Sequence, residues 1–286
     1  MIGNQEIKEK IERLIAETSS SLSDDVETAL RAAKESEESG SSAALTLDAI
    51  LRNIELARKS CTPLCQDTGT LTFFVDERLR DVATREAIAA ATAAATARGL
   101  LRKNCIDSIS GKSYDDNVAL GAPNIHYIEC DDEGKAPRIT LLMKGGGSEN
   151  MSRQYSLPDE ETGAGRDLEG VRKCILDAVV KAQGYGCAPG VLGVCIGGDR
   201  ATGYEIAKEQ LLRPLQDEAI DPTIAALEKR IVAEANSLGI GPMGLGGKTT
   251  LLGVKIAARP RVPASFFVTI AYMCWATRRR SIEIKL

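Results

Sequence analysis

The chain has 286 residues, 43% of them hydrophobic, so it is long enough to bury a sizeable core and is expected to be globular. Its formal net charge is −4, with 36 basic and 40 acidic residues, which disfavours the extended positive surface that nucleic acid binding requires. It contains no apolar run of about 18 residues that could span a membrane and no signal-peptide pattern, so we expect a cytoplasmic protein with neither nucleic-acid nor membrane partners.

The N-terminal part is predicted to be a helical arm at about residues 1–60. Apolar residues recur at three- and four-residue intervals over 7–34, and the Ser-rich stretch 18–23 interrupts them where a second helix can be capped. After the polar tract 35–42, the same periodicity returns over 43–58.

Beyond the arm, helices and short strands alternate. We predict strands at 71–75, 124–129, 138–143, 191–196 and 265–271, and helices at 85–99, 167–184, 201–212 and 224–238. No internal repeat or Pro-rich linker divides the chain. The sequence therefore predicts a mixed α/β fold with one or two small sheets, as a single domain over 1–286.

The loop Cys65-Gln66-Asp67-Thr68-Gly69 places a thiol, a carboxamide and a carboxylate side by side just before a predicted strand. A thiolate can bind iron, Gln66 can hydrogen-bond a substrate oxygen, and Asp67 can move a proton, provided that they face one cavity. In a purely structural interpretation, Asp67 caps a local turn and Cys65 belongs to the core.

A glycine cluster follows the strand at 138–143, in the sequence Lys144-Gly145-Gly146-Gly147-Ser148-Glu149-Asn150. Three consecutive glycines let the backbone approach a ligand closely and turn several N–H groups toward one anion, such as a carboxylate. A flexible turn explains the composition equally well.

A second glycine-rich stretch, 239–247, ends in Gly247-Lys248-Thr249 and invites comparison with a nucleotide-binding phosphate loop. The spacing is wrong, because the residue five before Gly247 is Pro242, which has no amide hydrogen. The preceding segment is also predicted to be helical and not a strand. A nucleotide-binding protein is therefore a minor alternative.

Eight cysteines occur, without any CxxC pair, so spacing alone selects no metal ligands. Their density is far below that of a disulfide-rich scaffold, and buried thiols are common in ordinary cores. His126 is the only histidine, and we interpret it as structural.

Taken together, five motifs carry a resemblance to a known family. They are Pro63 to Gly69, Lys144 to Asn150, Gly186-Cys187-Ala188-Pro189, Leu238 to Gly241 with Gly246-Gly247-Lys248, and Pro263-Ala264-Ser265 through Met273-Cys274-Trp275. Over nearly its whole length the chain resembles the α subunit, equivalent to the N-terminal domain, of the class I fumarases and the related L-tartrate dehydratases.

The resemblance implies a [4Fe–4S] cluster bound by Cys65, Cys187 and Cys274. The fourth iron then has no protein ligand and can act as a Lewis acid on a substrate carboxylate and hydroxyl. The other cysteines, at positions 61, 105, 130, 174 and 195, match no ligand position, and Cys195 is the nearest competitor of Cys187.

For the substrate, a small dicarboxylate, the resemblance implies contacts from Gln66, Asp67, Arg102, Gly147, Ser148 and Asn150. Arg102 would bind a carboxylate bidentately, and Asp67 would be the catalytic residue that exchanges a proton. Without the resemblance, we would interpret Arg102 as a solvated side chain at the end of an Ala-rich helix.

The implied activity is a hydro-lyase that hydrates fumarate to (S)-malate reversibly, a reaction of the tricarboxylic acid cycle, with L(+)-tartrate dehydration as the alternative. The sequence Ser148-Glu149-Asn150 favours fumarate. A separate β subunit is expected to complete the site in a heterotetramer. One departure is Val262, where family members commonly carry a histidine. A non-catalytic iron–sulfur scaffold is a further alternative.

Overall fold

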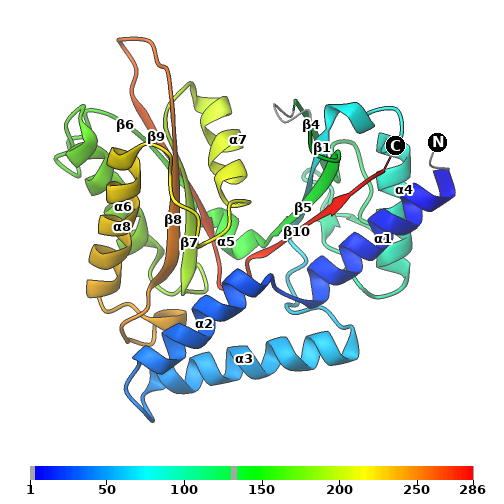
Figure 1. Cartoon of the computed structure of the whole chain (residues 1–286), viewed down its shortest axis with the longest axis horizontal. Coiled ribbons are helices and arrows are strands. Elements are labelled where there is room, and N and C mark those ends of the chain that lie inside the picture. The colour runs from blue at the N-terminus through cyan, green and yellow to red at the C-terminus, as the bar shows by residue number, and fades with distance from the viewer. Residues whose placement is uncertain (1–3, 130–133, 286) are drawn as a thin grey trace. The chain divides into compact units, whose positions relative to one another are not determined.

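The computed structural model describes residues 4–129 and 134–285. Its contacts divide the chain into two compact units, each assembled from separate stretches of sequence (Figure 1). The first unit comprises residues 1–23, 52–146 and 278–286, and the second comprises 24–51 and 147–277. The predicted helical part at about 1–60 is thus shared between the units. The assignment of 1–286 to a single family domain stays a prediction.

The helical arm is confirmed. It consists of α1 (Asn4–Ser20), α2 (Asp24–Ser36) and α3 (Ser42–Ser60). In α1 the side chains of Ile7, Ile11 and Leu14 are completely buried, as the three- and four-residue spacing predicts for a helix with one apolar face.

The first unit is built on a four-stranded sheet in the order β10 (Arg278–Glu283), β5 (Arg138–Lys144), β1 (Thr70–Asp76) and β4 (Asn124–Ile128). Strand β1 runs parallel to β4 and antiparallel to β5. Helices α1 and α4 (Arg85–Ala97) pack together on one face of this sheet (Figure 1). Thr84 caps α4 by accepting a hydrogen bond from the amide of Ala87.

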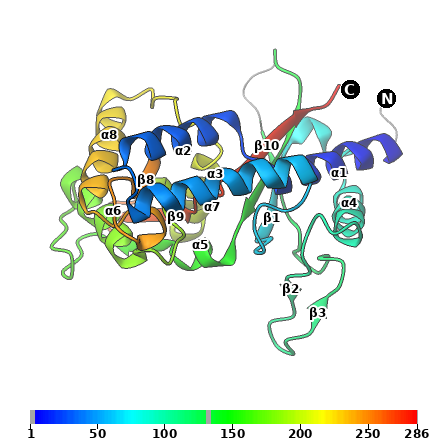
Figure 2. The ribbon, with the colours of Figure 1, turned by 90° about the horizontal axis from the view of Figure 1, so that it is seen from below.

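Between α4 and β4 the chain makes an excursion away from the sheet, which Figure 2 shows below α4 and β1. It contains two very short strands, β2 (Cys105–Ile106) and β3 (Ser113–Tyr114), which pair with each other. A single turn of 3₁₀ helix, Glu77–Leu79, follows β1.

The second unit contains another four-stranded sheet, in the order β6 (Arg153–Ser156), β9 (Phe267–Met273), β7 (Gly190–Gly197) and β8 (Leu251–Arg259). Helices α6 (Leu168–Ala182) and α8 (Pro222–Ser237) cover one face, and α7 (Arg200–Gln210) covers the other (Figure 1). The short helix α5 (Gly146–Asn150) precedes β6, and a 3₁₀ turn occupies Pro242–Gly244.

All eight residues of β7 are buried, because helices lie against both of its faces. Leu192 and Val194 belong to the core beneath α6 and α8. On the opposite face, Gly193 lets α7 approach so closely that an added Cβ atom would lie 2.0 Å from the carbonyl oxygen of Ala207. The apolar run of β7 is thus continuous because helices bury both faces of the strand.

The predicted mixed α/β fold is confirmed, and the predicted helices and strands correspond to observed elements. Strands β2, β3, β6, β8 and β10 were not predicted. The first two are only two residues long, β6 and β10 contain charged residues, and β8 follows a glycine-rich segment. Strands β6, β8 and β10 each pair with a strand that is distant in sequence, and α8 also packs against β8. Among the described residues, no helix has the length and apolar character needed to cross a membrane.

Candidate functional site

The Cys65–Gly69 loop lies immediately before β1 in the first unit. It is anchored at Leu64, whose amide donates to the carbonyl of Ser19 at 2.9 Å. The half-buried thiol of Cys65 accepts a hydrogen bond from the amide of Asp67 at 3.4 Å. Gly69 has a φ of 74°, and an added Cβ atom would lie 2.3 Å from the carbonyl oxygen of Lys144, so glycine is required there.

Asp67 brings the first two sequence motifs together. Its carboxylate lies against the backbone of Gly145, where an added Cβ atom would come within 2.8 Å of Oδ2. Gln66 is exposed, and within the described part of the chain its side chain forms no hydrogen bond. The carboxamide is thus available to a ligand.

A buried arginine that the sequence analysis did not single out also contacts this loop. Arg278, the first residue of β10, is 1% exposed and donates from Nη2 to the carbonyl oxygen of Asp67 at 2.8 Å. Its Nε and Nη1 atoms find no hydrogen-bond acceptor among the described residues. A buried guanidinium with unpaired N–H groups is costly, so it fits a site that gains negative charge when occupied.

Arg102 lies beside the same loop through its backbone. Its amide donates to Oγ1 of Thr68 at 2.7 Å. The guanidinium is exposed and has no ion pair or hydrogen bond with any residue that the structure describes. Cys65, Gln66, Asp67 and Arg102 are therefore gathered by the first unit alone.

In the second unit, Cys187 and Cys274 lie at one end of the sheet. Cys187 precedes β7 and Cys274 follows β9, and these antiparallel neighbours pair Val191 with Met273 at that end. The amide of Trp275 donates to the carbonyl oxygen of Cys187 at 3.1 Å. Both thiols are half-buried. Two of the three predicted cluster ligands are thus brought together by one strand pair.

Tyr272 supports both cysteine loops from within the core. Its ring fills the space over Gly186 and Gly190, where added Cβ atoms would lie 2.3 and 2.7 Å from ring carbons. Burial, followed by the charges that the Cys274 and Cys187 thiols can carry, raises the pKa of its hydroxyl. The glycine before Cys187 is therefore required by packing.

The glycine-rich segment 239–247 supports the Cys187 loop. The amide of Met243 donates to the carbonyl of Ala188 at 2.8 Å. An added Cβ atom at Gly184 would lie 2.4 Å from the carbonyl oxygen of Met243, so the two backbones touch. The abundance of glycine here reflects close backbone packing.

The backbone amides in Gly247-Lys248-Thr249 bind the carboxylate of Glu37, which belongs to the same chain. The amides of Lys248 and Thr249 donate to the carboxylate of Glu37 at 2.9 Å. The ammonium group of Lys248 donates to the carbonyl of Ser36 at 2.8 Å. The groups that would hold a phosphate therefore have intramolecular partners, which argues against a nucleotide site.

The glycine turn at Gly147–Asn150 forms the short helix α5. Gly147 and Asn150 are exposed, whereas Ser148 is buried. Glu149 forms an ion pair with Lys208 at 2.7 Å. The flexible turn considered from composition is replaced by helical structure, and the substrate contacts assigned to Gly147, Ser148 and Asn150 stay predictions.

The remaining described cysteines differ from the three predicted ligands. Cys174 and Cys195 are completely buried, and desolvation raises the pKa of each thiol to about 11. Burial also raises the pKa of Cys105. Cys61 is exposed, and Cys130 lies outside the described residues. A thiol that resists ionisation is a poor metal ligand, which favours Cys187 over Cys195.

His126 and Val262 belong to different units. His126 belongs to the first unit and stacks on Phe74, with ring centroids 5.4 Å apart, in agreement with a structural role. Val262 is 64% exposed in the β8–β9 loop, at the opposite end of the sheet from Cys187 and Cys274.

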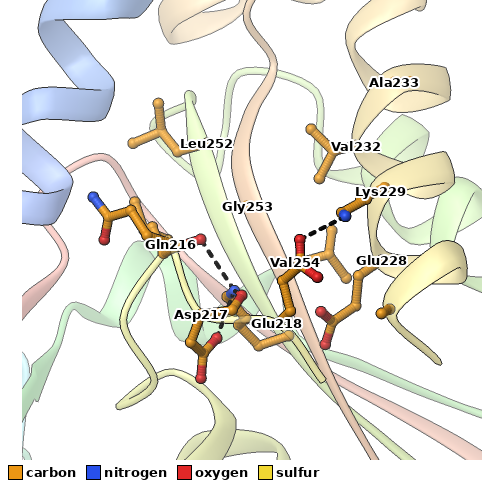
Figure 3. A pocket seen from close by; sticks show the side chains of 13 residues that line it. Gln216, Asp217, Glu218, Glu228, Lys229, Val232, Ala233, Leu252, Gly253 and Val254 are labelled. Atoms are coloured by element: carbon orange, nitrogen blue, oxygen red, sulfur yellow. Dashed lines mark hydrogen bonds and ion pairs between the residues drawn. The ribbon is translucent and has the colours of Figure 1, made fainter. Parts of the chain in front are cut away.

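A cavity of about 340 Å³ lies in the second unit between loop 215–218, helix α8 and strand β8 (Figure 3). Buried Lys255 forms an ion pair with Asp217 at 2.7 Å, and Lys229 pairs with Glu218 at 2.6 Å. None of the predicted site residues lines this cavity. Among the described residues, no group of three His, Cys, Asp or Glu side chains is arranged to hold a metal ion.

Comparison with known proteins decides the family. The model of the fumarate hydratase family, also called Fumerase, matches residues 8–283. The chain belongs to this family. The resemblance inferred from the five motifs is thus confirmed.

Its relatives carry two kinds of name. A Geobacillus stearothermophilus protein named "Putative fumarate hydratase class I" is 46% identical over 98% of this chain and 55% of its own length. A Methanocaldococcus jannaschii protein named "Putative L(+)-tartrate dehydratase subunit alpha" is 35% identical over 98% of both chains. The L(+)-tartrate dehydratase subunit alpha of Escherichia coli K12 is 29% identical over 97% of this chain and 90% of its own. The chain thus spans about half of the first relative and nearly all of the others.

Proposed function

We propose that this chain is the α subunit, or the equivalent domain, of a cytoplasmic hydro-lyase that hydrates fumarate to (S)-malate reversibly. The observation that carries the proposal is the common end of β7 and β9, where Cys187 and Cys274 lie with a backbone hydrogen bond between their loops. Family membership and the Cys65–Gly69 loop support the same activity.

We assign a [4Fe–4S] cluster to Cys65, Cys187 and Cys274. The donor set supports the assignment, because these thiols are half-buried and the competing Cys195 is completely buried with a raised pKa. Buried Arg278, beside Asp67, has N–H groups without an acceptor among residues 4–129 and 134–285, and these also suit a negatively charged neighbour. When bound, a cluster with three protein ligands supplies Lewis-acid chemistry at its remaining iron.

The chain's own residues would bind and orient the substrate. Arg102 would bind one carboxylate bidentately with its exposed guanidinium. Gln66 would donate a hydrogen bond from its carboxamide, and Asp67 would exchange a proton with the substrate. Gly147, Ser148 and Asn150 would contact the other end of the dicarboxylate. A β subunit, or a second domain, would supply the rest of the site in a heterotetramer.

The partner proposal is supported by the names and lengths of the relatives. Two of them are named as an alpha subunit and are similar in length to this chain, whereas the fumarate hydratase relative is almost twice as long. L(+)-tartrate dehydration is the second candidate activity, because those subunits carry that name. Higher identity to the fumarate hydratase relative, together with the sequence Ser148-Glu149-Asn150, favours fumarate.

The deciding experiment is anaerobic reconstitution of the chain with iron and sulfide, with and without its β partner. Fumarate, (S)-malate and L(+)-tartrate are then assayed as substrates. We expect visible cluster absorption, and turnover of fumarate and malate only when the partner is present. Absence of cluster binding under these conditions would refute the proposal, and turnover of tartrate alone would select the second candidate.

Single Ser variants test the ligand assignment. Cys65→Ser, Cys187→Ser and Cys274→Ser should each abolish the cluster absorption, whereas Cys195→Ser should retain it. Cys195→Ser is a matched control, because Cys195 lies in the same sheet but inside the core. Loss of absorption in Cys195→Ser with retention in Cys187→Ser would reverse the assignment.

A further inference from the structure

Asn117 occupies a special place in the excursion between α4 and β4 of the first unit. It is 4% exposed and has a φ of 61°, a left-handed conformation that asparagine tolerates better than most residues. Buried asparagine side chains need hydrogen-bond partners on both ends of the carboxamide. The surroundings of Asn117 supply them all.

The carboxamide of Asn117 forms hydrogen bonds with the backbone of residues 102–105. Its Oδ1 accepts from the amides of Asn104 and Cys105 at 2.9 and 3.0 Å. Its Nδ2 donates to the carbonyl oxygen of Arg102 at 2.9 Å and to Oγ1 of Thr96 at 3.1 Å. Asn117 therefore ties residues 102–105 to the end of helix α4.

Thr68 is the second residue that binds the backbone of Arg102. Thr68 is 2% exposed, and its Oγ1 accepts from the Arg102 amide at 2.7 Å. Thr68 thus fixes the N–H group of Arg102, and its hydroxyl also donates at 3.4 Å to the carbonyl oxygen that Asn117 holds at 2.9 Å. Since Thr68 directly follows Asp67, this pair of contacts also links Arg102 to the Cys65–Gly69 loop.

We propose that Asn117 and Thr68 are positioning residues, which fix the Arg102 backbone so that its exposed guanidinium is held ready for a substrate carboxylate. The inference rests on the proposed function, because it takes a dicarboxylate as the ligand. Fixing an exposed loop residue before binding avoids its ordering cost at the moment of binding. The two contacts should therefore lower KM.

A purely structural role gives a different kinetic result. Loss of a contact that only stabilises the fold reduces the fraction of active protein, so kcat per chain falls and KM stays unchanged. Loss of a contact that positions a binding group weakens substrate binding in the ground state and the transition state alike, so KM rises and kcat is maintained. The split between KM and kcat therefore separates the two roles.

Thr68→Val and Thr68→Ser form a matched pair for the kinetic test in the reconstituted enzyme. Valine keeps the shape and removes the hydroxyl, and we expect KM for the dicarboxylate to rise about tenfold with kcat within about threefold, as for loss of one hydrogen bond. Serine keeps the hydroxyl and should restore KM. Asn117→Gly removes the carboxamide without opposing the positive φ, and it should raise KM to a similar extent.

Amide hydrogen exchange of the cluster-free full chain tests the contacts without any turnover. Asn117→Gly should accelerate exchange at Asn104 and Cys105, and Thr68→Val should accelerate exchange at Arg102. Asn117→Asp retains the two acceptor sites, so it should leave the amides of Asn104 and Cys105 protected. Unchanged exchange in Asn117→Gly and Thr68→Val would overturn the inference.

Arg102→Ala distinguishes a failure of the positioning role from a failure of the proposed function. If exchange accelerates as expected and Arg102→Ala raises KM, but Thr68→Val and Asn117→Gly change only kcat, the positioning role is overturned and the proposed function stands. If Arg102→Ala itself leaves KM unchanged, Arg102 does not bind the substrate, and both the inference and that part of the proposed function fail.

Discussion

The ring of Tyr272 lies directly over the backbone of Gly186, so that a Cβ atom added to Gly186 would come within 2.3 Å of Cε1. Gly186→Ala therefore cannot be accommodated without moving the ring or the Cys187 loop. We expect the free energy of unfolding to fall by about 1–3 kcal/mol, the usual cost of overpacking a buried site. Urea denaturation of the cluster-free chain measures this change.

A double-mutant cycle provides the control for Gly186→Ala. Replacing Tyr272 by Leu removes the ring and creates room for the methyl group. The cost of Gly186→Ala should then be smaller in the Tyr272→Leu background than in the wild type. Equal costs in the two backgrounds would show that the contact with the ring does not constrain Gly186.

Glu37→Ala tests the internal carboxylate at Gly247-Lys248-Thr249. Removing the carboxylate leaves the amides of Lys248 and Thr249 without their acceptor, so the free energy of unfolding should fall by about 1–3 kcal/mol. Denaturation in urea measures the loss. Glu38→Ala is the matched control, because Glu38 is the exposed neighbour and should change stability little. Equal effects of the two variants would contradict the assigned role of Glu37.

Alkylation should distinguish Cys174 and Cys195 from the exposed thiol of Cys61. Both side chains are completely buried, and burial raises each pKa to about 11, so the folded chain offers the reagent neither access nor thiolate. Mass spectrometry of iodoacetamide-labelled peptides at pH 8 should show rapid labelling of Cys61 and labelling of the two buried thiols only as fast as the chain unfolds. Labelling of either buried thiol as fast as Cys61 would contradict its burial.

Asp217→Asn should destabilise the second unit in a pH-dependent way. Burial alone would raise the pKa of Asp217, but hydrogen bonds from Arg213 and Lys255 outweigh it and lower the pKa. The stabilisation is therefore complete above the unfolded-state pKa of about 3.9, and it is lost as the pH falls through the lower folded-state pKa. At pH 7 the variant should lose about 1–2 kcal/mol, allowing for a carboxylate that is 34% exposed.

Urea denaturation at several pH values tests whether folding lowers the pKa of Asp217, as expected, or raises it. The difference between the wild type and Asp217→Asn should shrink as the pH falls below about 4. Glu218→Gln serves as the control, because its ion pair with Lys229 is well exposed and should contribute little at any pH. A difference that grows on acidification would contradict the lowered pKa.

Arg278→Met should separate stability from function. Because Nε and Nη1 have no acceptor in the described part of the chain, the apolar replacement should leave the unfolding free energy of the cluster-free chain unchanged or higher. The Asp67 carbonyl loses the hydrogen bond from Arg278, so we expect cluster content or turnover to fall after reconstitution. Measuring urea denaturation and visible absorption together tests both parts. A strongly destabilised variant would show that Arg278 has an essential structural partner.

Local patterns were sufficient for the elements that bury a regular apolar face. The spacing of Ile7, Ile11 and Leu14 predicted α1, and the unbroken apolar run around Leu192 and Val194 predicted β7. Strand β10 could not be found in this way. Its Arg-Arg-Arg sequence has no apolar alternation, and it becomes a strand only by pairing with β5, from which it is separated by more than 130 residues.

The candidate site shows the same limit. Glycine and cysteine motifs identified the loops, but the buried partners of those loops carry no local signal. Arg278 and Glu37 resemble ordinary surface charges in sequence, and their hydrogen bonds to Asp67 and Lys248 each cross 211 residues. Asn117 carries no local signal either, because its four hydrogen bonds depend on a positive φ that the sequence does not reveal.

The position of β10 in the chain has a consequence for biosynthesis. The sheet of the first unit receives one of its four strands only after residues 147–277, almost the whole of the second unit, have left the ribosome. Until then β5 has an unpaired edge, and the Cys65–Gly69 loop lacks the hydrogen bond from Arg278 to the Asp67 carbonyl. The nascent first unit should therefore depend on chaperones, and the proposed cluster would be inserted only after release of the finished chain.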